Sequence, residues 1–438
     1  MKRCTATPRL WYNRTDYKEQ TVFLKRDFLI QNSRFLRYAA EKKSEVCFKI
    51  KFIIGWRLSA LEKIYLDNAA TTRVCEQAAE RVLYVMTQAY GNPSSLHSMG
   101  FEAEREMTAA RQAVADRLSV NSAEVYFTSG GTEANNIALF GAVKRNGRRG
   151  KRIVTTAVEH PSVLRVMEQL ERDGFTVEYL MPDATGHISS EQVERAITGD
   201  TILVSMMLVN NETGVRMPVE AAAEAIRRSK SPALLHVDAV QAFCKVPIKP
   251  ARVGINLMTV SSHKIHGPKG AGALYVAGQK DFPSRAFGGG QEKEVRPGTE
   301  PLPAIAGFGA AVHAMPQPQE LNAHFETLRT ALREQLGGLS GVVIHSPEDA
   351  VPYVCSFSVP GIRAETMLHF LSSKNIYVSS GSACSRAKPS HVLTAMGLAP
   401  ELVESSLRVS FSRFTTTEEI GALTAALRQG VEQLVKKS

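Results

Sequence analysis

The sequence predicts an α/β fold in which helices cover a mostly parallel β-sheet. From about Thr71 onward, short apolar runs alternate with longer segments of helical periodicity, the pattern of successive strand–helix units. Five of these runs end in a polar cluster, and ligands of open α/β sheets bind beyond the carboxyl ends of the strands. With 438 residues, 44% of them hydrophobic and 22% charged, the chain can bury a large core.

Six of the apolar runs are predicted as strands of this sheet: residues 124–128, 152–157, 201–208, 233–237, 257–261 and 272–276. A helical run, residues 133–143, follows the first of them. A long helix is expected to begin near Pro303 and to lead into a second domain, whose predicted strands are residues 355–359, 376–379 and 407–410. We expect a basic extension at residues 1–60, a large domain at 72–315, and a small domain formed by 61–71 and 316–438.

Positive charge is concentrated at the N-terminus. The formal net charge is +10, but residues 1–60 contain 14 Lys and Arg against 5 Asp and Glu, so nearly all of the excess lies there. The rest of the chain is close to neutral, which removes the electrostatic reason to expect nucleic acid as a partner. The acidic and aromatic residues of this segment argue against an organellar transit peptide. We expect an appended leader, with the functional protein beginning near Leu61.

The cysteine pattern favours a reducing compartment. Six cysteines in 438 residues show no CxxC pair and no metal-ligand spacing, far from the density of a disulfide-rich protein. No apolar stretch approaches the roughly 18 to 20 residues that a membrane span needs. No secretory signal is visible either. We therefore expect a cytoplasmic protein with no resident metal and no membrane contact.

Lys264 is the candidate for a reactive amine. It lies in the motif Ser261-Ser-His-Lys-Ile-His-Gly-Pro-Lys-Gly270. An apolar run, residues 255–260, precedes this motif, so a strand leads into a glycine-rich turn. The strand supplies rigidity, and the glycines let the backbone approach a ligand closely. A lone lysine in a loop is usually only a solvated surface residue. The surrounding chain changes that balance, because another ionisable group lies at a corresponding strand end.

Asp238 is that group, and it lies in His236-Val-Asp-Ala-Val-Gln241 at the end of an apolar run. A carboxylate at one strand end and a lysine at a later one are the two groups that pyridoxal phosphate requires, a pyridinium partner and a Schiff-base amine. The two motifs resemble the cofactor site of the fold-type I, class V aminotransferase-like enzymes. Within them, they resemble the cysteine desulfurases of the nitrogen-fixation and housekeeping branch. An Asp that only caps a turn is the competing explanation.

Further motifs extend the resemblance over residues 64–434. They follow in the order expected for the family: Tyr65-Leu-Asp-Asn-Ala-Ala-Thr-Thr72, Gly91-Asn-Pro-Ser-Ser95 with His97, Phe127-Thr-Ser-Gly-Gly-Thr-Glu-Ala-Asn-Asn136, Glu159-His-Pro-Ser162, Val209-Asn-Asn-Glu-Thr-Gly214, Arg296-Pro-Gly-Thr299 and Ser380-Gly-Ser-Ala-Cys384. The resemblance implies a fold-type I transferase with a seven-stranded sheet and a smaller α+β C-terminal domain. The last motif separates desulfurases from their aminotransferase relatives.

The resemblance also implies which residues bind the cofactor. Thr132, Ser261 and His263 would hold its phosphate, and Thr299 would reach the phosphate of the neighbouring subunit in a homodimer. Thr132 precedes a helical run whose N–H groups can bind an anion, although a simple N-cap fits equally well. The remaining implied ligands are His160, which would stack on the ring and move protons, Asn211 and Gln241, which would bind ring substituents, and Lys264 and Asp238.

Three residues are assigned to substrate and sulfur. Arg408 alternates with apolar neighbours, and its guanidinium fork suits the carboxylate of an amino acid, although an ordinary strand-edge arginine is the alternative. Asn68 is implied as a second substrate ligand. Cys384 lies among small and polar residues, and two cations that follow it favour the thiolate. By the same resemblance, Cys384 could contact a transient iron–sulfur cluster.

The expected reaction converts L-cysteine to L-alanine and leaves the sulfur as a persulfide on Cys384, from which an iron–sulfur scaffold or a thiolation enzyme would take it. The loop after Cys384 is shorter than in the scaffold-serving enzymes, which leaves the acceptor open. A selenocysteine lyase could use the same residues. A class V aminotransferase would need no exposed cysteine, and a pyridoxal-binding regulatory protein that recognises nucleic acid would not need the complete set.

Overall fold

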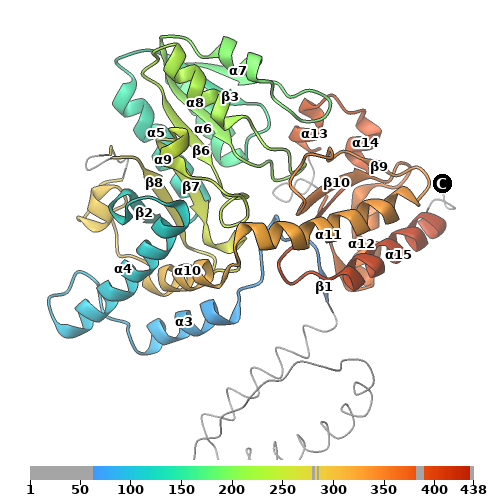
Figure 1. Ribbon diagram of the computed structural model, residues 1–438, viewed down its shortest axis with the longest axis horizontal. Coiled ribbons are helices and arrows are strands. Elements are labelled where there is room, and N and C mark those ends of the chain that lie inside the picture. Colours follow the sequence, from blue (N-terminus) through green and yellow to red (C-terminus); the bar gives the residue numbers. More distant parts are fainter. Residues whose placement is uncertain (1–62, 279–281, 284–285, 381–388, 435–438) are drawn as a thin grey trace, which may run out of the picture. The chain divides into compact units, whose positions relative to one another are not determined.

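A seven-stranded β-sheet forms the centre of the fold (Figure 1). The computed structural model describes residues 63–278, 282–283, 286–380 and 389–434. The strand order across the sheet is β2 (Val125–Thr128), β8 (Gly272–Val276), β7 (Leu257–Ser261), β6 (Leu234–Asp238), β5 (Thr201–Met207), β3 (Arg152–Thr156) and β4 (Thr176–Leu180). Six of the seven strands run in one direction and β8 runs opposite to them, so the mostly parallel seven-stranded sheet predicted for the chain is confirmed.

The six predicted strands of this sheet all form, and their observed ends agree with the predicted ones to within one residue. The seventh, β4, was not predicted. Its sequence, Thr-Val-Glu-Tyr-Leu, lies at the sheet edge and is mostly only half-buried. An edge strand lacks the continuous apolar run of a strand that is buried on both faces, and such runs were the basis of the prediction.

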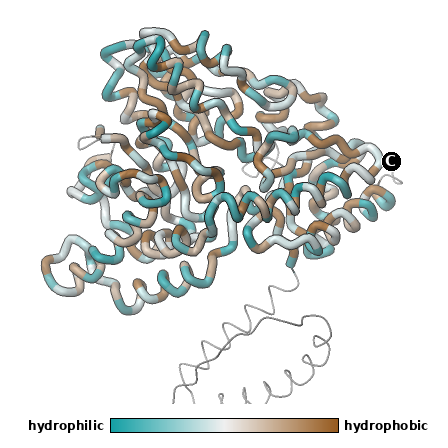
Figure 2. The backbone as a smooth tube through the Cα atoms, viewed as in Figure 1, coloured by the Kyte–Doolittle hydropathy of each residue, from teal (hydrophilic) through white to brown (hydrophobic). Residues whose placement is uncertain are grey.

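Helices cover both faces of the sheet. In β8, Ala273 and Tyr275 pack into one buried cluster, whereas Leu274 and Val276 pack into the other, because successive side chains of a strand point to opposite faces. One face is covered by α5 (Gly131–Asn146) and α6 (Pro161–Arg172). The other cluster includes side chains of α4 (Ser98–Leu118), α7 (Ser190–Ala196), α8 (Val219–Arg228) and α10 (Leu302–Ala314). Figure 2 shows apolar residues concentrated along the strands and mixed colouring along the covering helices.

The long helix expected from near Pro303 is in fact two helices. The first, α10, ends at Ala314, and the second, α11 (Pro318–Gly337), begins four residues later. Met315, which precedes Pro316, has ψ 130°, and Gln317, which precedes Pro318, has ψ 146°. A residue before proline avoids the helical region for steric reasons, so the two prolines divide the predicted helix.

The C-terminal part contains two small sheets. One is antiparallel, with the order β12 (Ser406–Ser410), β10 (Val354–Ser358) and β9 (Val343–Ile344). The other pairs β1 (Ile64–Tyr65) in parallel with β11 (Ile376–Tyr377). The helices of this part are α12 (Ala364–Ser373), α13 (His391–Ala395), α14 (Pro400–Glu404) and α15 (Thr417–Leu434). The β1–β11 pair joins chain segments more than 300 residues apart, and the division into two domains remains a prediction.

The remaining elements are short or lie outside the sheet: α3 (Glu76–Thr87), α9 (Pro250–Val253), and the 3₁₀ turns η1 (Ser122–Glu124), η2 (Ser262–Lys264) and η3 (Gln291–Glu294). Of the helices in the described ranges, none combines the length and the apolar character that crossing a membrane would require. The predicted basic extension, residues 1–60, and Cys384 lie outside the described residues.

Candidate active site

A cavity of about 850 Å³ opens at one edge of the sheet. Because β8 is antiparallel to both β2 and β7, the carboxyl ends of β2, β3, β5, β6 and β7 all lie at that edge. Nine residues selected from the sequence line this cavity: Thr132, His160, Asn211, Asp238, Gln241, Ser261, His263, Lys264 and Arg408. Eight of the nine come from the strand ends and the segments that follow them, and Arg408 comes from the separate sheet of the C-terminal part.

Lys264 enters the cavity from the turn that follows β7. Its Nζ donates hydrogen bonds to the backbone oxygens of Ala69, at 2.5 Å, and Ala70, at 2.8 Å. The turn is tight: a Cβ on Gly267 would lie only 2.1 Å from Ser262 Oγ, so a larger residue there would force Ser262 to move. The lysine therefore projects from a tight turn, and its amine is held by the carbonyl groups of Ala69 and Ala70.

Asp238 is the last residue of β6, and it is 6% exposed. Its Oδ1 accepts a hydrogen bond from the Val240 backbone N–H at 3.0 Å, and its Oδ2 accepts one from Asn135 Nδ2 at 2.8 Å. A buried carboxylate is tolerated only where hydrogen bonds or an opposite charge replace its hydration. Both oxygens meet that requirement while the side chain still faces the cavity.

His160 caps the N-terminus of α6, with Pro161 as the first helical residue. Its Nδ1 accepts a hydrogen bond from the Ser162 backbone N–H at 3.1 Å and lies 2.8 Å from Ser162 Oγ. Burial lowers the pKa of the imidazole, the positive charges of Lys264 and His391 lower it further, and Asp238 opposes them. The ring is therefore neutral near pH 7.

Several polar groups in the cavity wall suit a phosphorylated ligand. The start of α5, at Gly131 and Thr132, presents helix N–H groups, which attract anions. Close approach is built in here, since a Cβ on Gly131 would lie 2.9 Å from Val240 Cγ2. Ser261 Oγ and Gln241 Oε1 are buried and find no hydrogen-bond partner among the described residues. Buried polar atoms are nearly always paired, so these two are suited to contact a bound molecule.

His263 completes this side of the cavity. Its Nδ1 lies 3.2 Å from Thr71 Oγ1. Burial, together with Lys264 and other nearby cations, lowers the pKa of its imidazole to about 4. The ring is thus neutral, and it can offer a hydrogen bond to an anion without adding a charge.

Arg408 reaches the cavity from β12 and is 1% exposed. Its Nη2 lies 2.8 Å from Asp67 Oδ1, and its Nη1 donates a hydrogen bond to the Asn211 backbone oxygen at 2.9 Å. Sequence reasoning did not identify Asp67 as its partner, because the two residues are 341 positions apart. The pair fixes the guanidinium in place, and a carboxylate ligand would share it with Asp67.

Two residues assigned from the sequence do not line the cavity. The amide of Asn68 donates hydrogen bonds to the backbone oxygens of Tyr65 and Ser410, and Asn68 is 4% exposed. Thr299 is exposed on the surface. The roles given to both, and the role given to Cys384 outside the described residues, remain predictions.

The cavity lining also includes polar residues that were not selected from the sequence, among them Asn135, Ser162 and His391. Glu159 does not line the cavity, but its backbone oxygen lies 3.0 Å from His391 Nε2. Asn135 could have been found from helical periodicity. It lies on the buried face of α5 with Ala134, Ala138 and Leu139. A polar residue on an apolar stripe indicates a buried hydrogen-bonding role.

Glu159 is fully buried behind His160. Its Oε1 accepts hydrogen bonds from Thr156 Oγ1 and from the Met207 N–H, both at 2.8 Å. Burial raises the pKa of this carboxyl to about 8, against the effect of those two hydrogen bonds. Near neutral pH, Glu159 therefore carries a proton, and it joins the end of β3 to the end of β5.

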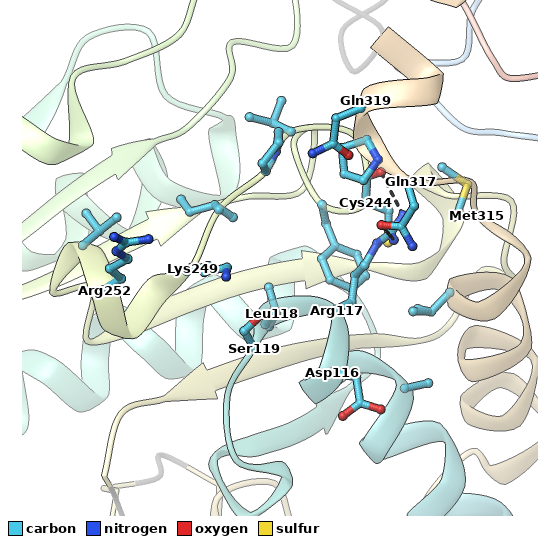
Figure 3. A pocket seen from close by; sticks show the side chains of 18 of the residues that line it. Asp116, Arg117, Leu118, Ser119, Cys244, Lys249, Arg252, Met315, Gln317 and Gln319 are labelled. Atoms are coloured by element: carbon cyan, nitrogen blue, oxygen red, sulfur yellow. Dashed lines mark hydrogen bonds between the residues drawn. The ribbon is translucent and has the colours of Figure 1, made fainter. Parts of the chain in front are cut away.

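A second cavity, of about 640 Å³, shares no lining residue with the first. Figure 3 shows its wall, where Arg117 at the end of α4 donates a hydrogen bond to Gln317 Oε1 at 3.3 Å. The same guanidinium donates to the Pro316 backbone oxygen at 2.5 Å. These contacts connect α4 to the break between α10 and α11, which is a structural role.

Comparison with known proteins places the site in context. The sequence profile of the aminotransferase class V family matches residues 64–423. The cysteine desulfurase IscS of Vibrio vulnificus strain CMCP6 is 41% identical over 380 residues, covering 85% of this chain and 93% of that protein. The cysteine desulfurase IscS of Methanosarcina thermophila is 38% identical over 375 residues, covering 85% and 92%.

Solved structures agree with these relatives. A structure described as a NifS-like protein has a TM-score of 0.79 and 36% identity, covering 84% of this chain and 99% of its own. A structure of SspA in complex with cysteine has a TM-score of 0.71 and 32% identity, covering 81% and 100%.

Proposed function

The chain belongs to the class V aminotransferase family, and we propose that it is a pyridoxal-phosphate-dependent cysteine desulfurase that converts L-cysteine to L-alanine. The single observation that carries this proposal is the meeting of Lys264, Asp238 and Arg408 in one cavity. An amine, a buried carboxylate and a guanidinium are what binding an amino acid to this cofactor requires. The substrate class is inferred from relatives that are named cysteine desulfurases and that match most of this chain.

The residues present fit pyridoxal phosphate. Asp238 would pair with its protonated ring nitrogen, and Lys264 would hold it through the amine. The start of α5, Ser261 and His263 would bind the phosphate, and the buried Ser261 Oγ and Gln241 Oε1 would gain the partners that they lack among the described residues. When bound, the cofactor supplies a sink for the electron pair released at the substrate Cα.

The chain's own groups do the rest. Arg408 would orient the substrate carboxylate by a bidentate contact. The substrate would share the guanidinium group with Asp67. Lys264 Nζ would leave the carbonyls of Ala69 and Ala70 to hold the cofactor. Once the substrate amine has taken its place, the free Nζ would carry protons to and from the substrate. Glu159, protonated and buried, adds no negative charge beside Asp238.

Sulfur transfer is assigned to Cys384. Its thiolate would attack the substrate sulfur, and the new S–S bond would form as the substrate C–S bond breaks. The electron pair of that bond would stay with the carbon part, which takes up protons and leaves as alanine. The persulfide would then pass its outer sulfur to an acceptor, for which we propose an iron–sulfur scaffold or a thiolation enzyme.

We also propose a homodimer. Four large apolar side chains in α3 and the segment that follows it, Leu83, Met86, Tyr90 and Leu96, are 56%, 61%, 65% and 90% exposed. If they form a contiguous patch, that patch would be suited to association with another chain. A second copy would cover the patch, and Thr299, exposed and absent from its own cavity, would serve the partner's phosphate. A fully active monomer in analytical ultracentrifugation would exclude this arrangement.

The direct test is the yield of alanine and sulfide from L-cysteine, with selenocysteine assayed alongside. Equal yields of both products from cysteine, dependent on added cofactor and reductant, would support the proposal. Activity on selenocysteine alone would make the protein a selenocysteine lyase. A cytoplasmic location remains a prediction from the cysteine pattern.

A further inference from the structure

Four side chains form a continuous hydrogen-bonded chain along the wall of the cavity. Asn135 of α5 donates from Nδ2 to Asp238 Oδ2 and also to Ser162 Oγ, both at 2.8 Å. Ser162 Oγ lies 2.8 Å from His160 Nδ1, and the Ser162 backbone N–H donates to the same nitrogen at 3.1 Å. Asn135 is 1% and Ser162 8% exposed, so water hardly competes for these bonds.

The direction of every bond in this chain follows from which groups can donate. A carboxylate oxygen only accepts, so Asn135 must present its NH₂ group to Asp238. The reverse orientation would place the amide oxygen against the carboxylate. The two hydrogens of that NH₂ group serve Asp238 and Ser162, and Ser162 Oγ is therefore an acceptor from Asn135. Its own hydrogen is left for the next atom in reach, His160 Nδ1.

The backbone gives an independent argument for the same direction. An amide N–H can only donate, so the 3.1 Å contact from Ser162 N requires a lone pair on His160 Nδ1. Two donors thus converge on this nitrogen. In a neutral imidazole one nitrogen accepts and the other carries the hydrogen, which places the hydrogen of His160 on Nε2.

We propose that Asn135 and Ser162 are positioning residues that fix His160 in the Nε2–H tautomer and tie its orientation to Asp238. This inference rests on the proposed function, because it gives these residues a part in that site. Its consequence concerns proton transfer. Neutral His160 can donate a hydrogen bond from Nε2 but has no lone pair there, and gaining a proton at Nδ1 would break both bonds from Ser162. Accepting the substrate's proton therefore falls to Lys264.

The test reads the tautomer directly. In holoenzyme labelled with ¹⁵N-histidine, the ring nitrogens of His160 are assigned by the signals that vanish in His160→Asn. We expect an unprotonated Nδ1 and a protonated Nε2 near neutral pH. Hydrogen on Nδ1 in the wild-type protein would overturn the proposal without any further variant.

Three variants test the residues themselves. Ser162→Ala removes one of the two donors to Nδ1, and we expect the population with hydrogen on Nδ1 to rise about tenfold, as expected for the loss of one hydrogen bond. Ser162→Thr keeps the hydroxyl and should retain the wild-type tautomer. Asn135→Leu removes the amide that donates to Ser162 Oγ, so the hydroxyl hydrogen is no longer directed to His160 Nδ1, and this variant should resemble Ser162→Ala.

Asn136→Ala is the matched control. Asn136 is adjacent in α5, but its Nδ2 donates to the Thr132 backbone oxygen at 2.9 Å and takes no part in the chain. A folded Ser162→Ala protein in which the population with hydrogen on Nδ1 does not rise would refute the proposal. Because the tautomer is read by NMR, a failed desulfurase assay with the expected tautomer would refute the proposed function and leave the positioning role standing.

Discussion

Arg111 and Glu292 form a bidentate ion pair, in which Nη1 and Nη2 each lie 2.7 Å from a carboxylate oxygen. The Glu292 side chain is completely buried, and the Phe127 backbone N–H also donates to it at 2.8 Å. The pair anchors a segment in which Glu292, Lys293 and Glu294 all have positive φ, at 47°, 52° and 65°. L-residues disfavour this conformation, so the ion pair holds an unfavourable backbone in place.

We predict that Arg111→Ala will lower the free energy of unfolding by about 3 to 5 kcal/mol, because it leaves the buried Glu292 carboxylate without its counter-charge. Urea unfolding followed by circular dichroism measures the loss. Arg81→Ala is the control: Arg81 pairs with Glu106 at 2.9 Å but is 44% exposed. That change should cost less than about 1 kcal/mol. Equal effects of the two variants would contradict a special role for the buried pair.

Glu294→Gly should stabilise the protein by about 1 kcal/mol. At φ 65°, a residue with a Cβ is strained by roughly 1 to 2 kcal/mol, and glycine relieves most of this while losing some backbone entropy. Glu294→Ala removes the same carboxylate but keeps the Cβ. The comparison of the two midpoints in urea therefore isolates the backbone effect, and a gain in both variants would point to charge instead.

Glu159→Gln should alter how stability depends on pH. The carboxyl has an ordinary pKa of 4.5 when unfolded and about 8 when folded. Between those values the folded state binds a proton that the unfolded state lacks, so the wild-type free energy of unfolding falls as pH rises from about 5 to about 8. The glutamine cannot ionise. The free energy of unfolding of Glu159→Gln, relative to that of the wild type, should therefore rise between about pH 5 and about pH 8. Urea unfolding at both pH values measures this difference. A difference that does not change with pH would show that Glu159 is ionised in the folded protein.

Lys264→Ala should yield a protein that loses its cofactor on gel filtration and whose activity falls at least about 100-fold, since both the covalent attachment and the proton carrier are removed. The visible absorbance of the desalted protein is the measurement. Lys269→Ala changes an exposed lysine in the same turn and should leave the spectrum and rate unchanged. Retained colour in Lys264→Ala would move the assignment to another amine.

Cys384→Ser should still bind the cofactor and still change its spectrum on addition of cysteine, because the thiolate acts only after the substrate is bound. Persulfide and sulfide formation should be abolished, since a hydroxyl is a far weaker nucleophile than a thiolate. Single-turnover assays with a reductant separate the two steps. Wild-type rates of alanine and sulfide release in this variant would transfer the role to a different thiol.

Local patterns were enough to predict the strands and the residues at their ends. Asp238 and Lys264 were identified because the first ends a strand of a parallel sheet and the second follows one, and the carboxyl ends of such strands meet at one edge. The edge strand β4 and the break between α10 and α11 were missed. The first has no continuous apolar run, and the second is caused by two closely spaced prolines, Pro316 and Pro318, which keep the residues before them out of the helical region.

By itself, the sequence determined the α/β class and the positions of the main strands along the chain, because hydrophobic periodicity and strand ends are local properties. Most side chains of the cavity were assigned from the motifs that resemble the family. Only the tertiary structure decided the partners. Asp67 meets Arg408 across 341 positions, and Asn135 joins Asp238 to Ser162 because the phase of α5 turns it, and not Asn136, toward the sheet. Helical periodicity can indicate that Asn135 is buried, but its partners, like those of Arg408, depend on long-range packing.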